Sequence, residues 1–402
     1  MTIKEKIIHF IKQETVLVVA TILAIVSAFF VPPSVAYLEY IDWRVLGILL
    51  SLMIIMAGLQ KTGLFDTIGA KLLGKTSNTR QLAFILVFLC FFFSMLITND
   101  VALFTFVPFA IIMLRKCKQE KMLIPVLVLQ TIAANLGSML TPIGNPQNLY
   151  LYNLSGMGMG EFMGVMLPYT IISGVLLCIA ILICCKKEPI TEIAIGEENT
   201  AHLSGKEGAI EALTEEEQKA LEEKATLEKG RNLIKNTVYI TLFVLSLFVV
   251  VRLVPFEMVL LAILLLVFNM DRKVLTQVDY CLLLTFIAFF IFTGNMGNIT
   301  VVRETLQQLV AGRELAIGVL SSQAISNVPA ALLLSGFTTN YRELLIGVNL
   351  GGLGTLIASM ASLISYKLFA KEYNDQKGKY FWWFTAANVV FLAVLAVAAV
   401  VM

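Results

Sequence analysis

Residues 135–152 read NLGSMLTPIGNPQNLYLY and lie inside a long apolar stretch of the chain. Two prolines and a glycine fall within TPIGNPQN at 141–148, and neither residue type continues a helix cleanly. We therefore predict a helix that unwinds here and begins again near Gln147. At such an interruption, free N–H groups favour an anion and free carbonyl groups favour a cation.

The chain contains a second copy of this stretch. Residues 349–366 read NLGGLGTLIASMASLISY and align with 135–152 without gaps, with seven of 18 positions identical. Two shorter strings repeat in the same order upstream: ITNDVA at 97–102 matches ISNVPA at 325–330, and IDW at 41–43 matches VDY at 278–280. We therefore predict an internal repeat, whose second interruption depends on Gly351, Gly352 and Gly354 instead of prolines.

The composition is that of a membrane protein. Of the 402 residues, 58% are hydrophobic and 14% are charged, whereas a soluble domain is about one quarter charged. We predict an all-α polytopic membrane protein in contact with the lipid bilayer. Full spans are expected at about 15–31, 43–59, 123–152, 168–185, 237–253, 256–270, 279–296, 343–369 and 380–401. A net charge of +2 gives no indication of nucleic-acid binding, and two His with six Cys lacking C-x-x-C spacing give no zinc site.

Positive charges fix the expected orientation. With the N-terminus and the 186–235 loop in the cytoplasm, 25 of the 30 Lys and Arg residues lie on the cytoplasmic side, among them every Lys. This distribution follows the positive-inside rule. We therefore expect a multi-pass protein of a bacterial-type cytoplasmic (inner) membrane, with the C-terminus outside.

This orientation requires residues 81–115 to enter and leave on the same side. As one straight helix the segment would be about 50 Å long, against a hydrocarbon core of roughly 30 Å. Its only strongly polar triplet is Thr-Asn-Asp at 98–100, so we predict a re-entrant hairpin with its tip there. A second short apolar pair, at 315–339, is the expected counterpart.

The two copies are expected to be inverted. The first begins with a span running outward at 15–31, and the second with one running inward at 256–270, because 237–253 is an extra span. Inverted repeats with interrupted helices are typical of secondary transporters. We therefore divide the chain into a first transmembrane repeat (1–185), a cytoplasmic acidic helical linker (186–235), and the extra span with the second inverted repeat (236–402).

Polar residues at the tips and interruptions are the candidate substrate ligands. They are Thr98, Asn99, Asp100, Thr141, Asn145, Gln147, Asn148, Ser326, Asn327, Thr355, Ser359 and Ser362. Asp100 is the only acidic residue expected near the membrane centre, where a carboxylate is costly and usually functional. It could bind a cation or carry a proton, or it could cap a helix at the tip.

Three motifs carry a resemblance to a known family: ITNDVAL at 97–103, ANLGSMLTPIGNPQNL at 134–149 and ISNVPA at 325–330. They resemble the ion transporter superfamily, which includes arsenite permeases, sodium/proton antiporters and citrate- or dicarboxylate-type symporters. The resemblance covers the chain outside 186–235 and is closest to the arsenite-permease, antiporter and citrate-transporter-like branches. The tips here read TND and SNV where the dicarboxylate (divalent anion symporter) branch usually reads SNT.

The resemblance implies two re-entrant hairpins, two interrupted helices, a homodimer and an elevator-like movement of the transport part. It also implies Na⁺ sites between each hairpin tip and its interrupted helix. In this chain the matching positions of the first site are Thr98, Asn99 and Gly144, with Asp100 beside them. Those of the second site are Ser326, Asn327 and Ala358.

The favoured function is secondary active transport of a small anion or oxyacid, citrate-like or arsenite-like, coupled to Na⁺ or H⁺. The alternatives are a sodium/proton antiporter that exchanges ions at Asp100, and an anion channel. An enzyme is not expected, because no Ser–His–Asp set is present and His9 and His202 lie outside the central spans. No cofactor is expected besides the coupling ion.

Overall fold

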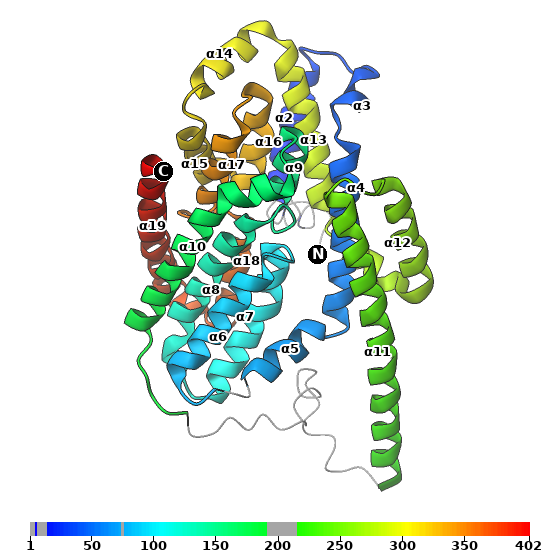
Figure 1. Ribbon diagram of the computed structural model, residues 1–402, viewed down its shortest axis with the longest axis vertical. Helices are drawn as coiled ribbons and strands as arrows, with labels where there is room; N and C mark the ends of the chain where they lie inside the picture. Colours follow the sequence, from blue (N-terminus) through cyan, green and yellow to red (C-terminus); the bar gives the residue numbers. More distant parts are fainter. Residues whose placement is uncertain (1–4, 6–13, 74–75, 191–214) are drawn as a thin grey trace.

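A computed structural model describes residues 5, 14–73, 76–190 and 215–402 (Figure 1). Within these ranges the chain is helical, apart from an isolated bridge between Asn78 and Pro189. The α-helices are α2 (Thr15–Ala28), α3 (Ala36–Tyr40), α4 (Trp43–Lys61), α5 (Leu64–Leu73), α6 (Thr79–Phe93), α7 (Asn99–Lys116), α8 (Leu123–Gly137), α9 (Pro146–Ser155), α10 (Met159–Cys184), α11 (Glu215–Val250), α12 (Phe256–Asp271), α13 (Tyr280–Asn298), α14 (Thr300–Val310), α15 (Glu314–Ile325), α16 (Asn327–Leu334), α17 (Tyr341–Leu350), α18 (Met360–Glu372) and α19 (Lys377–Val401).

The expectation of a polytopic helical membrane protein is confirmed. Six helical stretches of the described chain are long and apolar enough to cross a membrane: 43–61, 120–140, 159–184, 230–250, 280–298 and 374–401. The expected spans at 15–31 and 256–270 form shorter helices, α2 and α12, of 14 and 16 residues.

The helices form two neighbouring groups. In one, α4 packs against α11 and α12, and α2 packs along α13. In the other, α6 packs against α7 and α8, α15 packs against α16 and α17, and α18 contacts α7, α8 and α19. Figure 1 shows α11 and α12 on one side of the molecule and α10 and α19 on the other.

Two aspartates in matching positions of the repeat begin the helices that flank the later site. Asp42 Oδ1 accepts a hydrogen bond from Val45 N at 2.9 Å, at the start of α4. Asp279 Oδ1 accepts one from Leu282 N at 3.0 Å, at the start of α13. Both are N-caps that satisfy a free helix donor, so the repeat of Asp followed by an aromatic residue has a structural basis.

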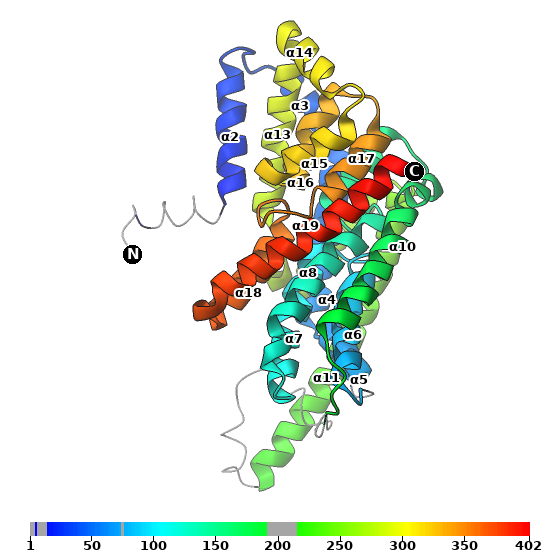
Figure 2. The ribbon, with the colours of Figure 1, turned by 90° about the vertical axis from the view of Figure 1, so that its left-hand side faces the viewer.

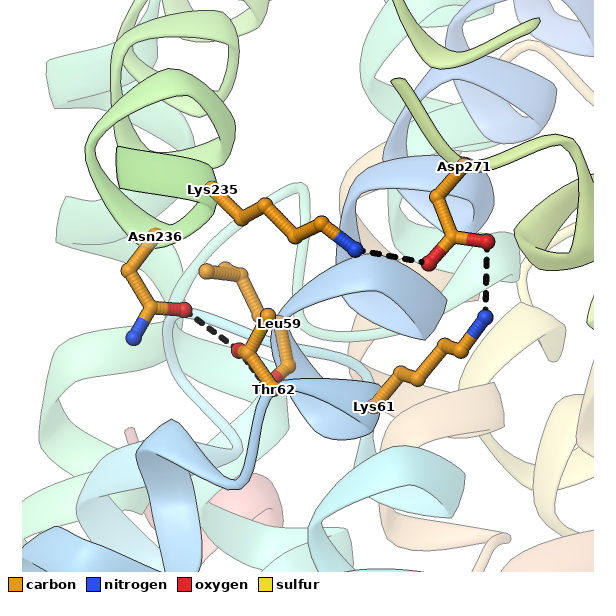
Figure 3. A network of polar contacts seen from close by, with 6 residues as sticks. All are labelled: Leu59, Lys61, Thr62, Lys235, Asn236 and Asp271. Carbon is orange, nitrogen blue, oxygen red and sulfur yellow. Dashed lines mark hydrogen bonds and ion pairs between the residues drawn. The ribbon is translucent and has the colours of Figure 1, made fainter. Parts of the chain in front are cut away.

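An ion-pair network joins the ends of α4 and α12 to the middle of α11 in the first group (Figure 3). Asp271 on α12 contacts Lys61 Nζ of α4 at 2.7 Å and Lys235 Nζ of α11 at 3.1 Å. Thr62 beside it donates hydrogen bonds to Leu59 O at 2.8 Å and to the side chain of Asn236. The network holds α4, α11 and α12 together as one unit.

Several boundaries differ from the sequence-based expectation. Helix α10 begins at Met159 instead of residue 168, because Pro168 is accommodated inside the helix, as membrane helices often allow. Helix α11 runs without interruption from Glu215 to Val250, so the boundary proposed at 235 falls within it. Residues 191–214 of the linker and both histidines lie outside the described residues. The division into three parts stays a prediction.

Three short helices, α3, α5 and α14, lie outside the expected spans. Helices α5 and α14 connect longer elements, and α14 shows one apolar and one polar face. Their apolar residues are too few to indicate a span, and amphipathic helices of this kind are typical of a membrane interface.

Candidate functional site

The first hairpin consists of α6 and α7, which are joined by a turn at residues 94–98. The backbone N–H of Asn99 donates to the carbonyl of Gly144 at 3.1 Å. Its side-chain Nδ2 donates to Asn135 Oδ1 at 3.0 Å, and its Oδ1 accepts from Asp100 N at 2.9 Å. Asn99 thus ties the tip to the interrupted helix and satisfies a free donor at the start of α7.

The interrupted helix unwinds as the prolines and the glycine predict. Helix α8 ends at Gly137, a short 3₁₀ turn covers 138–140, and α9 begins at Pro146, a position where the missing N–H of proline costs nothing. Thr141 Oγ1 donates to Met95 O of the hairpin turn. Asn148 Nδ2 donates to Ser138 O at 3.1 Å, so side chains replace the lost helical hydrogen bonds.

The second half repeats most of these contacts, but Asn349 Oδ1 has no donor among the described residues where Asn135 Oδ1 accepts from Asn99. The N–H of Asn327 donates to the carbonyl of Ala358 at 3.0 Å, as Asn99 does to Gly144. Asn327 Oδ1 accepts from Val328 N at 3.0 Å. Thr355 Oγ1 donates to Gln323 O at 3.2 Å, as Thr141 does to Met95. Apart from this difference, each tip is bound to its interruption in the same way.

The second interruption is one residue longer than the first although it lacks prolines. Helix α17 ends at Leu350 and α18 begins at Met360. Gln323 replaces the missing backbone partners: its Nε2 donates to Gly351 O and Leu353 O at 2.9 Å each, and its Oε1 accepts from Thr355 N. Gln323 was not anticipated from the sequence, because its partners lie about 30 residues away.

Side chains join the two interruptions directly. Asn135 Nδ2 donates to Ser362 Oγ at 3.1 Å, and Ser359 Oγ donates to Asn135 Oδ1 at 3.0 Å. In the matching position Asn349 Nδ2 donates to Asn148 Oδ1 at 2.7 Å. Asn135 and Asn349 were not among the expected site residues, although the first position of the repeated 18-residue string could have indicated them.

A cavity of about 340 Å³ lies between the first hairpin tip and helices α4 and α13. Its polar lining residues are Gln60, Thr98, Asp100, Asn145, Gln277 and Asp279. The described residues that line it include no Lys or Arg. A smaller recess shares Asp279 with the cavity and reaches Val328 and Pro329 at the second tip.

The structure divides the expected site residues into two sets. Thr98, Asp100 and Asn145 line the cavity. The second set does not line the cavity. Its buried members are Asn99, Gly144, Gln147, Asn148, Ser326, Asn327, Ala358, Ser359 and Ser362, while Thr141 is half-buried and Thr355 is exposed. Ser326 has a φ of 73°, a left-handed conformation that non-glycine residues seldom adopt.

Two polar side chains at the first tip and interruption lack hydrogen-bond partners among the described residues. The carboxylate of Asp100 accepts no hydrogen bond from the described residues, and α7 has no side-chain cap hydrogen bond. Gln147 is fully buried, and both its amide oxygen and its amide nitrogen lack a partner. An unpaired buried amide costs roughly 1–3 kcal/mol. Gln147 does not line the cavity, so of these two side chains only Asp100 is open to a ligand there. Among the described residues no cluster of three or more His, Cys, Asp or Glu could hold a metal ion.

Sequence comparison identifies the family that shares this architecture. The citrate transporter family model matches residues 5–341, which is most of the chain. The chain belongs to the citrate transporter family. This confirms the resemblance drawn from the hairpin and interruption motifs.

Individual relatives agree with this membership. An uncharacterized transporter of Methanocaldococcus jannaschii is 33% identical over 82% of this chain and 81% of its own length. The inner membrane protein YbiR of Escherichia coli is 30% identical over 89% and 86%. A silicon efflux transporter of Oryza sativa is 27% identical over 42% of this chain and 36% of its own. The family, the archaeal relative and the rice relative are named as transporters, and YbiR is named as an inner membrane protein.

Proposed function

We propose that the protein is a secondary active transporter that moves a small anion or oxyacid across the inner membrane, coupled to Na⁺ or H⁺. The observation that carries this proposal is the pair of equivalent contacts, Asn99 N to Gly144 O and Asn327 N to Ala358 O. Each binds a hairpin tip to an unwound helix, and the two unwound helices touch through Asn135 and Asn349.

The arrangement supports inverted repeats with re-entrant hairpins. Figure 1 places α6 and α7 in the lower half of the molecule and α15 and α16 in the upper half. The tips of both hairpins point toward the middle, where four helices, α7, α9, α16 and α18, also begin. Their N-termini carry partial positive charge and free N–H groups, which suit an anionic or oxygen-rich substrate without a basic side chain.

Coupling ions would bind beside this substrate. Thr98, Asn99, Asp100 and Gly144 supply oxygens near the first tip, and Ser326, Asn327 and Ala358 supply them near the second. Uncharged oxygens and one carboxylate are ligands that Na⁺ accepts at an unwound helix. Because the cavity is lined by two carboxylates and by no basic residue, a polyanion would require such bound cations to offset repulsion.

Movement would follow the division into two helix groups. The group with α4, α11, α12, α2 and α13 would form a fixed frame, through which the protein dimerises. The group with the hairpins and interrupted helices would slide past it as an elevator. The cavity lies on the boundary between the groups, which is where alternating access requires a path.

The second candidate is a sodium/proton antiporter. The unpaired carboxylate of Asp100 on the cavity wall favours it, since one carboxylate can carry either Na⁺ or a proton. Proton release on Na⁺ addition without any anion would identify this activity.

Proteoliposomes test the proposal directly. Purified protein would be reconstituted, and uptake of labelled citrate and of arsenite measured with a Na⁺ gradient, a pH gradient, both or neither. We expect gradient-driven accumulation of one of these compounds above equilibrium. Uptake that only equilibrates, with electrical conductance, would indicate an anion channel, and a lack of any flux would contradict transport of this substrate class.

A further inference from the structure

A long apolar groove lies between α10 and α19, on the outside of the hairpin-containing group. Its volume is about 650 Å³. Its lining is apolar except for one charged residue, Lys379. The apolar lining residues are Leu129, Ala180, Ile183, Cys184, Trp382, Trp383, Ala386, Ala387, Val390 and Phe391. None of the expected site residues lines this groove.

The groove opens on the surface that faces lipid. Ile183 is 76% exposed and Trp382 71% exposed, and Val390 beside them is also exposed. Figure 2, which views this side, shows α10 and α19 in front of the other helices. Acyl chains cover apolar surface in a bilayer, and a groove of this kind leaves room for one chain between α10 and α19.

Lys379 lines the groove, and three further lysines lie close to its lining residues along the chain. Lys377 and Lys379 begin α19, and Lys186 and Lys187 follow the end of α10. All four are exposed, and none takes part in a salt bridge among the described residues. Glu188 and Asp375 lie nearby in the sequence, so these two stretches keep a net positive charge.

We propose that this groove binds one anionic phospholipid, with an acyl chain along α19 and the phosphate group at the lysines. From Lys379 to Phe391, α19 rises about 18 Å, close to the depth of one leaflet, which is half of a core of roughly 30 Å. Tryptophans close to Lys379 along the chain fit the headgroup region. Basic residues between membrane helices on the cytoplasmic side are a recognised setting for anionic headgroups.

The opposite face of α19 connects the groove to the interrupted helices. Tyr380 is buried, and its hydroxyl lies 3.0 Å from Ser365 Oγ of α18. Thr131 Oγ1 of α8 donates to the same Ser365 Oγ at 2.7 Å. A bound lipid therefore supports the helix that holds α8 and α18 together, and its binding should raise the thermal stability of the protein.

The three tryptophans of the chain permit a direct test. In a Trp43→Phe variant of the full chain, only Trp382 and Trp383 remain, both in the groove. This variant would be reconstituted in phosphatidylcholine that contains increasing amounts of dibromo-acyl phosphatidylglycerol or dibromo-acyl phosphatidylcholine. Bromine quenches tryptophan fluorescence on contact, so half-quenching reports the lipid that occupies the groove.

We expect brominated phosphatidylglycerol to reach half-quenching at a severalfold lower mole fraction than brominated phosphatidylcholine. Each lysine near a headgroup raises the affinity for an anionic lipid about fivefold. A Lys377→Gln, Lys379→Gln double variant should lose most of this preference. A Lys118→Gln, Lys121→Gln variant removes two exposed lysines elsewhere on the cytoplasmic side and should keep it. Equal quenching by both lipids would overturn the site in favour of ordinary bilayer contact. Absence of quenching would overturn it in favour of a second copy of the chain covering the groove.

Discussion

Asp100 directly follows Asn99, which ties the first hairpin tip to the interrupted helix, and Asp100 lines the cavity. A capping role does not account for its carboxylate, because α7 has no side-chain cap hydrogen bond. A carboxylate without a partner on a cavity wall is costly to keep unless it binds a cation or a proton. The role of Asp100 is therefore the most informative one to test.

Asp100→Asn should abolish coupled transport and flatten the pH dependence of any remaining exchange, because the side chain keeps its shape but no longer titrates. Thermal stability should change little, since an amide is easier to bury than a carboxylate. Flux in proteoliposomes between pH 5 and 9 and a melting curve would measure both. Asp375→Asn, on an exposed turn, is the control. Normal coupled flux with an unchanged pH profile would exclude a carrier role.

Asn99→Ala and Asn327→Ala should each lower transport while the protein remains folded. Each removes a helix-start contact worth about 1 kcal/mol, and Asn99→Ala also leaves Asn135 Oδ1 with one donor fewer. If the amide oxygens bind the coupling ion, apparent Na⁺ affinity should fall roughly tenfold or more. Rates measured against Na⁺ concentration would reveal this. Full activity and unchanged Na⁺ affinity in both variants would contradict the assigned cation sites.

Site residues differ in how far the sequence could reveal them. Thr98, Asn99 and Asp100 are identifiable because they form the only strongly polar triplet in an apolar segment. Asp279 was expected only as a counterpart of Asp42, since its place on the cavity depends on where α13 begins in space. Asn135 gains its role from Asn99, Ser359 and Ser362, contacts that no local pattern specifies.

The interruptions are the elements whose sequence is most constrained. In the first, a Cβ added to Gly144 would lie 2.1 Å from Ser138 O, a distance that only movement of the backbone could relieve. The same carbonyl accepts from Asn148 Nδ2. The glycine thus allows the turn that brings the start of α9 toward the hairpin tip.

Gly144→Ala should therefore reduce transport strongly and lower the melting temperature, because the unwound stretch must shift away from Asn99. An overpacked site of this kind costs about 1–3 kcal/mol. Gly158→Ala is a matched control before α10, since nothing lies within 4 Å of an added Cβ. Equal flux in the two variants would show that the close packing at Gly144 is dispensable.

The two hairpins should open toward opposite sides of the membrane. In a cysteine-free background, Ser77→Cys and Lys116→Cys should react with an impermeant maleimide only from the cytoplasm. Arg313→Cys and Arg342→Cys should react only from outside. All four positions are exposed. Labelling of positions 77 and 116 from opposite faces would contradict a re-entrant hairpin and, with it, the inverted repeat.

Helix interruptions and spans could be predicted where the local residue composition determines them. The Pro-Gly-Pro pattern identified the first interruption, and the 18-residue repeat transferred that expectation to 351–359. Helix α14 was missed because its apolar residues occupy one face of only 11 residues, which resembles a polar loop in a span search. The start of α10 was placed late because a proline inside a membrane helix looks like a boundary.

The molecule combines a group of helices joined by ion pairs with a second group that contains the hairpins and the interrupted helices. Asp271 with Lys61 and Lys235 fastens α4, α11 and α12 at one end, whereas the cavity separates this group from the first hairpin. Neither the division nor the cavity follows from spans alone, because both depend on contacts between helices distant in the chain. The boundary at the cavity is lined by Gln, Asp, Thr and Asn side chains among larger apolar residues.

If the groups move as rigid bodies, a link across the cavity should stop transport and a link within one group should not. Ala57 on α4 and Val101 on α7 line opposite walls of the cavity, so an Ala57→Cys, Val101→Cys pair joined by a flexible bis-maleimide should lose flux. Arg115 and Glu372, 2.6 Å apart and exposed, lie within the hairpin group. An Arg115→Cys, Glu372→Cys pair should therefore keep flux when joined. Equal inhibition by both links would indicate that the hairpin group itself deforms, and full activity of the linked first pair would exclude movement across this boundary.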